Sequence, residues 1–86
     1  MMTFEWDAAK SAEIKAERGA SFEELEKVIV QDGGLLDVLD NPGYPKQSRY
    51  IVRLDQRVWV VIVEERGEIL RIVTAWVDRK MRKIYG

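Results

Sequence analysis

The sequence contains no cysteine and no histidine, and each absence excludes a class of chemistry. Without cysteine there is no disulfide and no thiolate, so a disulfide-stapled secreted module is not expected and a reducing cytoplasm is the predicted location. Without histidine, imidazole sites for zinc, copper or haem are excluded, as are triads that need a histidine base. We therefore expect no metal and no other cofactor, and any catalysis has to use carboxylates, lysine, arginine, tyrosine or the backbone.

Long apolar runs are also missing. The longest, VWVVIV at 58–63, is far too short to cross a bilayer, and MMTFEWDAAK at the start lacks the basic flank and apolar block of a signal peptide. The 86 residues are 47% apolar and 34% charged, a balance typical of globular proteins. We therefore expect one small domain over residues 1–86, with no membrane partner.

What the sequence does have is an uneven distribution of charge. Residues 1–40 hold four cations and ten acids, a net of -6, and residues 41–86 hold ten cations and five acids, a net of +5. Four of the cations fall within five positions near the end: Arg79, Lys80, Arg82 and Lys83. A basic half indicates a polyanionic partner, whereas the alternative is that the two halves neutralise each other in the fold.

The acidic half is predicted to form two helices. Asp7 is a suitable N-cap for AAKSAEIKAER, and Gly19 stands where a left-handed C-cap is expected. A second helix opens at Ser21, where Glu24 completes an S-x-x-E capping box, and QDGG at 31–34 ends it. Apolar residues recur along this second helix at helical spacing and are predicted to pack on a sheet: Phe22, Leu25, Val28 and Ile29.

The basic half is predicted to form a meander of three strands, at 49–54, 57–63 and 68–77. Asp55-Gln56 is expected to be a two-residue turn, and Glu65-Arg66-Gly67 a three-residue turn. The predicted fold class is therefore α+β, with both helices on one face of an antiparallel sheet of three or four strands and a short basic C-terminal segment. Before the meander, LLDVL is either a short edge strand or irregular, and the segment 40–48, with its two prolines, is predicted to be a loop.

Each face of this sheet has a predicted environment. The expected register gives a nearly all-apolar face that should meet the helices, through the pairs Ile62–Leu70, Val60–Ile72 and Val58–Thr74. The opposite face is aromatic and cationic and should face solvent, through the pairs Val61–Arg71, Trp59–Val73 and Arg57–Ala75. Trp76 is predicted to lie in the core. The register of the first strand stays open, since one choice puts Tyr50 on the cationic face and the other puts Arg53 there.

Three stretches, in order, resemble one protein family. FEWDAAKSAEIKAERGASFEELEKVI resembles the opening of the BrnT-type toxins, YPKQSRYIV with RVWVVIVEERGEILRIVTAW resembles their strands, and DRKMRKIYG resembles their ending. The resemblance implies a RelE-like α+β fold and a toxin of a bacterial type II toxin–antitoxin system that cuts RNA without a metal. It also implies a cognate antitoxin that binds and blocks the toxin, a homo-oligomer or a hetero-oligomer with that antitoxin, and a complex that often represses its own promoter.

The sequence departs from the family pattern at three places. The family's commoner K-H-G at the end of the first helix is Glu17-Arg18-Gly19 here, so any role of that histidine is lost. The S-A-R of many members, late in the last strand, is Thr74-Ala75-Trp76. The serine that one subgroup carries before Arg79 is Asp78.

The residue types near the C-terminus suit RNA cleavage by attack of a ribose 2′-hydroxyl, which needs a base, an acid and stabilisation of the charged phosphorane. Arginine clamps phosphate with two hydrogen bonds, lysine can act as a base where neighbouring cations lower its pKa, and tyrosine donates a proton or stacks on a base. The predicted catalytic residues are Arg79, Lys80, Lys83 and Tyr85. The predicted RNA-binding residues are Arg71, Arg82, Trp59 and Arg53.

Two other interpretations of these cations stay open. They are also what a C-terminal helical turn needs to complement its dipole, an effect of only about 0.3–1 kcal/mol. Alternatively, the protein is a catalytically inactive RelE-like module that uses the same basic face to bind an antitoxin or nucleic acid. A proton acceptor close to the cations would favour catalysis, and the candidates are Glu64, Asp78 and Lys80.

Overall fold

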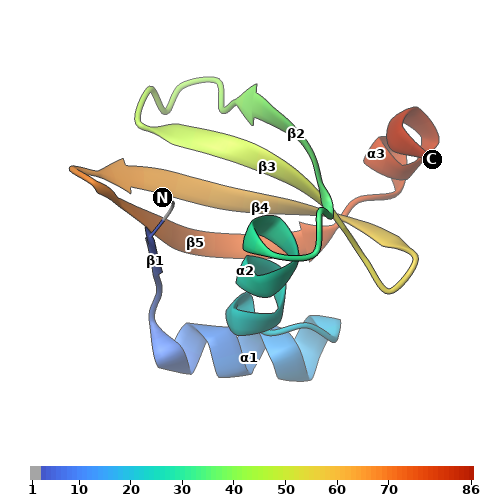
Figure 1. Ribbon diagram of the computed structural model, residues 1–86, viewed down its shortest axis with the longest axis horizontal. Coiled ribbons are helices and arrows are strands. Elements are labelled where there is room, and N and C mark those ends of the chain that lie inside the picture. The colour runs from blue at the N-terminus through green and yellow to red at the C-terminus, as the bar shows by residue number, and fades with distance from the viewer. Residues whose placement is uncertain (1–2) are drawn as a thin grey trace.

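The computed structural model describes residues 3–86, which form three helices around a five-stranded sheet (Figure 1). Residues 1–2 of the predicted domain 1–86 lie outside the described range. The elements, in chain order, are β1 (Thr3–Glu5), α1 (Ala8–Arg18), α2 (Phe22–Val30), β2 (Leu35–Asp40), β3 (Gln47–Leu54), β4 (Arg57–Arg66), β5 (Ile69–Val77) and α3 (Arg79–Tyr85). The predicted α+β class is confirmed.

The sheet has the order β1-β5-β4-β3-β2 and is mixed, because β1 runs parallel to β5 while all other neighbours are antiparallel. The predicted sheet of three or four antiparallel strands was therefore incomplete. The strand β1 was not predicted, since three residues carry no readable alternation. The segment LLDVL is an edge strand, as one of the two alternatives had it, and the following loop is shorter than predicted because β3 begins at Gln47.

The two N-terminal helices begin and end where the sequence predicts. The Asp7 carboxylate accepts a hydrogen bond from the Lys10 amide at 3.0 Å, and Gly19 ends α1 with a φ of 99°. Ser21 and Glu24 form the expected capping box of α2. The Ser11 hydroxyl, buried in α1, accepts a hydrogen bond from the Phe22 amide at 2.9 Å and so fixes the start of α2 against α1.

The turns of the meander explain where the predicted register fails. Asp55 and Gln56 form the expected two-residue turn, with φ values of 53° and 65°. The next turn has two residues rather than the predicted three, because Arg66 pairs directly with Ile69 across Gly67 and Glu68. The register then skips Val73, so that Ile62 lies opposite Thr74 and Val60 opposite Trp76.

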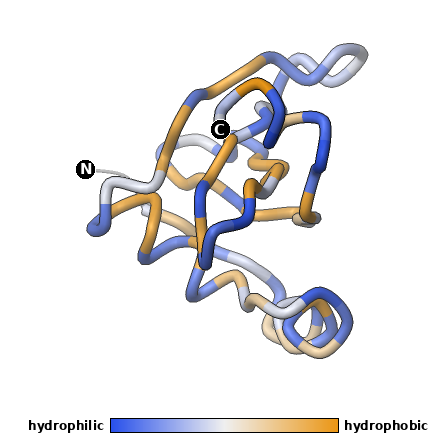
Figure 2. Tube along the Cα trace, turned by 90° about the vertical axis from the view of Figure 1, so that its right-hand side faces the viewer, coloured by the Kyte–Doolittle hydropathy of each residue, from blue (hydrophilic) through white to orange (hydrophobic). Residues whose placement is uncertain are grey.

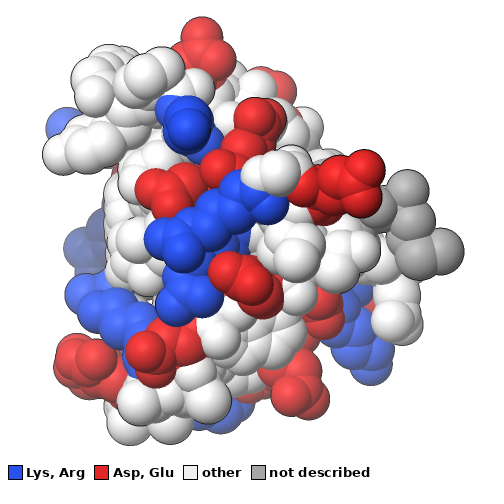
Figure 3. Space-filling view, turned by 90° about the vertical axis from the view of Figure 1, so that its left-hand side faces the viewer, with Lys and Arg blue, Asp and Glu red and all other residues white. Residues whose placement is uncertain are grey.

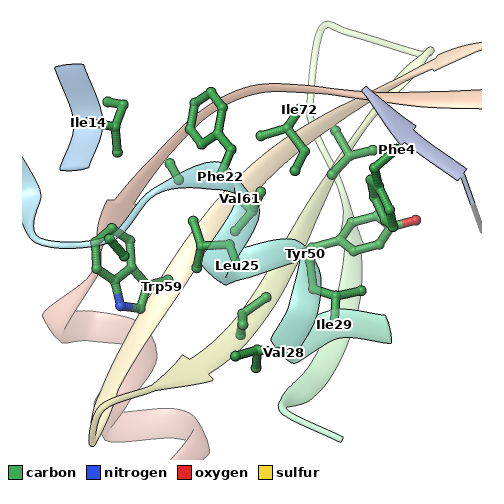
Figure 4. Close-up of a cluster of buried hydrophobic side chains, with 14 residues drawn as sticks. Phe4, Ile14, Phe22, Leu25, Val28, Ile29, Tyr50, Trp59, Val61 and Ile72 are labelled. Carbon is green, nitrogen blue, oxygen red and sulfur yellow. The ribbon is translucent and has the colours of Figure 1, made fainter. Parts of the chain in front are cut away.

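The predicted environments of the two faces of β4 are also wrong. Trp59, Val61 and Val63 face α1 and α2, in a cluster that also contains Phe22 and Leu25 (Figure 4). The alternate residues of β4 lie in a second cluster on the other face of the sheet: Val58, Val60 and Ile62. This second cluster is covered by α3, through Met81 and Tyr85, so β4 is buried on both faces.

Figure 2, seen from the α3 end, shows α1 and the C-terminal helix on opposite sides of the strands. In β3, Tyr50 and Val52 belong to the cluster under α1 and α2, and Tyr50 packs edge-on against Phe4 with ring centroids 6.3 Å apart. Arg53 lies on the opposite face, beside α3, which settles the register that the sequence left open. None of the helices within residues 3–86 is long and apolar enough to span a membrane.

Candidate functional site

The helix α3 follows β5 directly and is held at its first turn by Asp78. The Asp78 Oδ1 atom accepts hydrogen bonds from the amides of Lys80 and Met81 at 2.9 and 3.1 Å, and Oδ2 accepts one from the Trp76 indole at 3.3 Å. These donors lower the pKa of Asp78, the Met81 amide most strongly. Asp78 is therefore a charged N-cap that connects the end of β5 to the start of α3.

The last turn of α3 is fixed to β3 and β2. The Arg53 guanidinium donates to the carbonyls of Tyr85 and Gly86, at 2.8 and 3.3 Å. The Tyr85 hydroxyl donates to Asp37 Oδ2 at 2.6 Å, and this hydrogen bond lowers the pKa of Asp37 and raises the pKa of Tyr85. Arg53 was predicted to contact RNA, but its guanidinium forms hydrogen bonds with the backbone at the end of α3.

With Met81 and Tyr85 turned towards the sheet, the cations of α3 point outwards. All four are exposed: Arg79, Lys80, Arg82 and Lys83. Within residues 3–86 none of them forms an ion pair with a carboxylate. The segment that the sequence marked as the most basic is therefore a helix with hydrogen bonds at both ends and with accessible positive charge.

A cleft of about 470 Å³ lies where the start of β4 meets the junction of β5 and α3. Its lining residues are Arg57, Val58, Val77, Asp78, Arg79 and Arg82. The Arg57 guanidinium lies 5.3 Å from the centroid of the Trp59 ring and donates to the Arg18 carbonyl at 3.4 Å. The Arg18 side chain donates to the Ala75 carbonyl at 2.7 Å.

Arg57 was not among the predicted site residues. It is the first residue of β4 and directly follows the two-residue turn, which places it at the sheet end where β5 finishes and α3 begins. Antiparallel pairing alone brings these chain segments together, so the predicted strand boundaries already contained this signal.

Arg71 does not join the α3 cations. It is seven residues before Asp78 on β5, and a strand rises about 3.3 Å per residue, which puts the two roughly 20 Å apart. Arg71 instead pairs with Glu5 at 3.0 Å, and Arg66 pairs with Glu64 at 2.8 Å. From the side opposite α3, Figure 3 accordingly shows Lys and Arg atoms in a band bordered by acidic atoms.

The predicted role of Trp59 as a stacking platform is wrong. Its side chain is completely buried, because α1 and α2 cover the face of β4 that carries Trp59, Val61 and Val63. Trp76, predicted to lie in the core, packs against the second cluster, which contains Val60. Trp76 is half-buried beside α3, where its indole donates to Asp78.

The three proton acceptors named from the sequence are placed differently. Glu64 lies on β4 near the β4–β5 turn, and hydrogen bonds from Arg66 and Gln47 lower its pKa, which makes it a weak base. Asp78 lines the cleft, but both of its oxygens already accept hydrogen bonds. Lys80 is exposed on α3. Among residues 3–86, no three acidic side chains gather as a metal-ligand cluster.

The fold and the site describe a small α+β protein whose anchored terminal helix presents cations beside an arginine-lined cleft. Residues 6–83 match the model of a family described as the ribonuclease toxin, BrnT, of type II toxin–antitoxin systems. The chain belongs to this family, as its resemblance predicted, and an antitoxin is the partner that membership implies. No curated protein matches the chain.

Proposed function

We propose that the protein is a metal-independent endoribonuclease that cleaves RNA by attack of a ribose 2′-hydroxyl and is neutralised by a cognate antitoxin. Membership of the ribonuclease toxin family supports the reaction class. The observation that carries the mechanism is the set of exposed α3 cations, which have no carboxylate partner within residues 3–86. We further propose that the chain is one RelE-like domain, acts in the cytoplasm and forms a hetero-oligomer with the antitoxin.

In the proposed reaction, a base removes the 2′-hydroxyl proton, the 2′-oxygen attacks the adjacent phosphorus, and the 5′-oxygen leaves with a proton. The products are a 2′,3′-cyclic phosphate and a 5′-hydroxyl end. Arg79 is proposed to bind the scissile phosphate and stabilise the charge that develops on it, since a guanidinium offers two parallel hydrogen bonds. Lys80, the neighbouring amine, is the proposed base, and Lys83 adds positive charge to the same exposed surface.

Tyr85 is the least direct of the four proposed catalytic residues. Its hydroxyl proton is already donated to Asp37, so Tyr85 would have to leave Asp37 before it could protonate the departing 5′-oxygen. The hydrogen bond supports a second role for Tyr85, which is to hold α3 in place. Tyr85→Phe loses both the proton and the hydrogen bond to Asp37, whereas Asp37→Ala loses the hydrogen bond alone, so the two variants together separate proton transfer from anchoring of α3.

The test is induction of the protein alone in bacteria, together with cleavage of RNA by the purified protein. We expect growth arrest and RNA degradation that co-expression of the antitoxin prevents. In vitro, cleavage should persist in excess chelator and should leave 2′,3′-cyclic phosphate ends. If RNA and growth stay intact while the protein still binds its antitoxin, the inactive binding module is the correct function. Cleavage that stops with chelator would contradict the proposed mechanism.

A further inference from the structure

The arginine-lined cleft has features of a phosphate pocket rather than of an incidental surface hollow. Three arginines line it, from the start of β4 and from the first turns of α3. Val58, at its edge, is fully buried and Val77 is half-buried, so part of the lining is apolar. Hydrogen bonds to an anion are stronger beside such a surface than in open water.

Arg57 is held in place before any ligand binds. Its guanidinium lies against the Trp59 ring and donates one hydrogen bond of 3.4 Å to the Arg18 carbonyl. Gly19 permits this position, because a Cβ atom there would lie only 3.0 Å from Arg57 Nη2. A guanidinium has five N–H donors, so most of those on Arg57 remain available, and little side-chain freedom is left to lose on binding.

The charge of the cleft matches the proposed transition state. Arg57, Arg79 and Arg82 with the one carboxylate of Asp78 give a formal charge of +2. The carboxylate does not compete strongly for a ligand's place, since its oxygens accept hydrogen bonds from Trp76, Lys80 and Met81. A phosphodiester with one negative charge leaves a positive excess, whereas a doubly negative phosphorane neutralises the cleft.

From these observations we propose that Arg57, Arg79 and Arg82 bind one and the same phosphate of the RNA strand, with Arg57 as the preorganised member. The inference rests on the proposed function, because it takes the bound phosphate to be the scissile one. It assigns Arg57 a role in binding and positioning RNA.

Binding of a fully 2′-O-methylated RNA strand, which cannot be cleaved, tests the inference without requiring activity. The test variant is Arg57→Met, which keeps an apolar chain against Trp59 and removes the guanidinium. Losing a charge-assisted contact should weaken binding about tenfold and reduce the slope of log affinity against log salt by about 0.7. The matched control is Arg66→Met at the other end of the same strand, which should change neither quantity.

A double-mutant cycle asks whether the arginines share a phosphate. If they do, Arg57→Met and Arg82→Met together should weaken binding by clearly less than the product of the two single effects. Independent, multiplicative losses would overturn the shared pocket, and an unchanged affinity in Arg57→Met would overturn its role altogether. Should Arg57→Met unfold, the side-chain NMR signal of Arg57 in the wild-type protein decides, because RNA binding must shift it.

The outcomes separate this inference from the proposed function. If the wild-type protein binds the methylated strand through the cleft but leaves ordinary RNA intact, the phosphate pocket stands and the ribonuclease proposal fails. If ordinary RNA is cleaved at the same rate by Arg57→Met and by the wild-type protein, the ribonuclease proposal stands and the pocket is wrong.

Discussion

The cations at one end of the sheet are paired with carboxylates, whereas those at the other end are exposed. At the end of the β4–β5 turn, Arg66 and Arg71 are each paired with a glutamate. At the opposite end, α3 and the start of β4 present arginines and lysines, and the carboxylate that lines the cleft, Asp78, accepts hydrogen bonds from the backbone of α3. Figure 1 shows these two regions at opposite sides of the molecule.

This difference shows why a count of charges along the chain is insufficient. Arg71 and Arg79 both belong to the basic half, yet Arg71 neutralises an acid of the N-terminal strand while Arg79 faces solvent. From the sequence, the acidic and basic halves could either neutralise each other or leave a basic surface. In the fold, charges are paired at the end with the β4–β5 turn, and a basic surface remains at the α3 end.

The largest expected effect concerns the chemistry at the α3 end. Arg79→Ala or Lys80→Ala should each lower the single-turnover rate of RNA cleavage by two to three orders of magnitude, about 3–4 kcal/mol of lost transition-state stabilisation. Arg71→Ala is the control from the paired end and should cleave at nearly the wild-type rate. Thermal unfolding of all three should stay close to the wild type, since surface substitutions usually change stability by no more than about 0.5 kcal/mol. An equally large loss of rate in Arg71→Ala would show that the cations at both ends of the sheet contribute to cleavage, contrary to this prediction.

A smaller effect is expected from the cap that holds α3. Asp78→Ala removes the acceptor of the Lys80 and Met81 amides and of the Trp76 indole, and a lost N-cap typically costs about 1 kcal/mol. Urea unfolding measures the loss, and backbone NMR signals of α3 report whether the helix frays. Asp78→Asn, which keeps a cap oxygen, should lose less than Asp78→Ala. Equal stabilities for Asp78→Ala and the wild type would mean that α3 is held by its packing alone.

The hydrogen bond between Tyr85 and Asp37 should give the α3 end a pH-dependent contribution to stability. The pKa of Asp37 is lowered by folding, so its contribution is present above the unfolded value of about 3.9 and is lost as pH falls through the folded pKa. The pKa of Tyr85 is raised, so its contribution is present below about 10 and is lost as pH rises through the folded pKa. The wild type should therefore exceed Tyr85→Phe in melting temperature between these limits and lose that advantage at acid pH. An advantage that does not shrink as pH falls below the unfolded value would contradict this assignment.

The smallest effect is expected at the paired end. Glu5 and Arg71 are partly exposed, and such ion pairs contribute only about 0.2–1 kcal/mol. A double-mutant cycle of Glu5→Gln and Arg71→Gln should give a coupling energy in this range at low salt. Because salt screens surface charges, the coupling should nearly vanish in 1 M salt. A large, salt-independent coupling would show that the pair helps to define the position of β1.

Features that depend on neighbouring residues were predictable from the sequence. The caps at Asp7, Ser21 and Gly19 and the turn at Asp55-Gln56 rest on local hydrogen bonds and φ values, which the residue types themselves determine. The family was predictable as well, because three ordered stretches extend over nearly the whole chain.

The faces of the sheet were not predictable, because every residue from Val58 to Val63 is apolar. Alternation distinguishes a buried face from an exposed face, and a strand that is buried on both faces has none. The predicted register was also wrong, because Ile62 lies opposite Thr74 and not Leu70. That shift of four residues is even and keeps the same residues of β4 and β5 on one face, so the choice of the face that meets α1 and α2 was a separate error. The skipped residue Val73 gave no signal of its own. For lack of alternation Trp59 was assigned to solvent. Arg57 was missed although the predicted strand boundaries already placed it at the end of the sheet where β5 finishes.

The covering of β4 by α3 has a consequence for how the protein behaves at high concentration. No residue of α3 is itself buried, so this helix can open locally at far lower cost than the whole fold. Each opening uncovers the apolar strip of Val58, Val60 and Ile62 on a central strand. Exposed strips of β-branched side chains promote self-association, so the helix that carries the proposed chemistry also protects the sheet from aggregation. A partner that binds α3 would suppress these openings and keep the protein monodisperse.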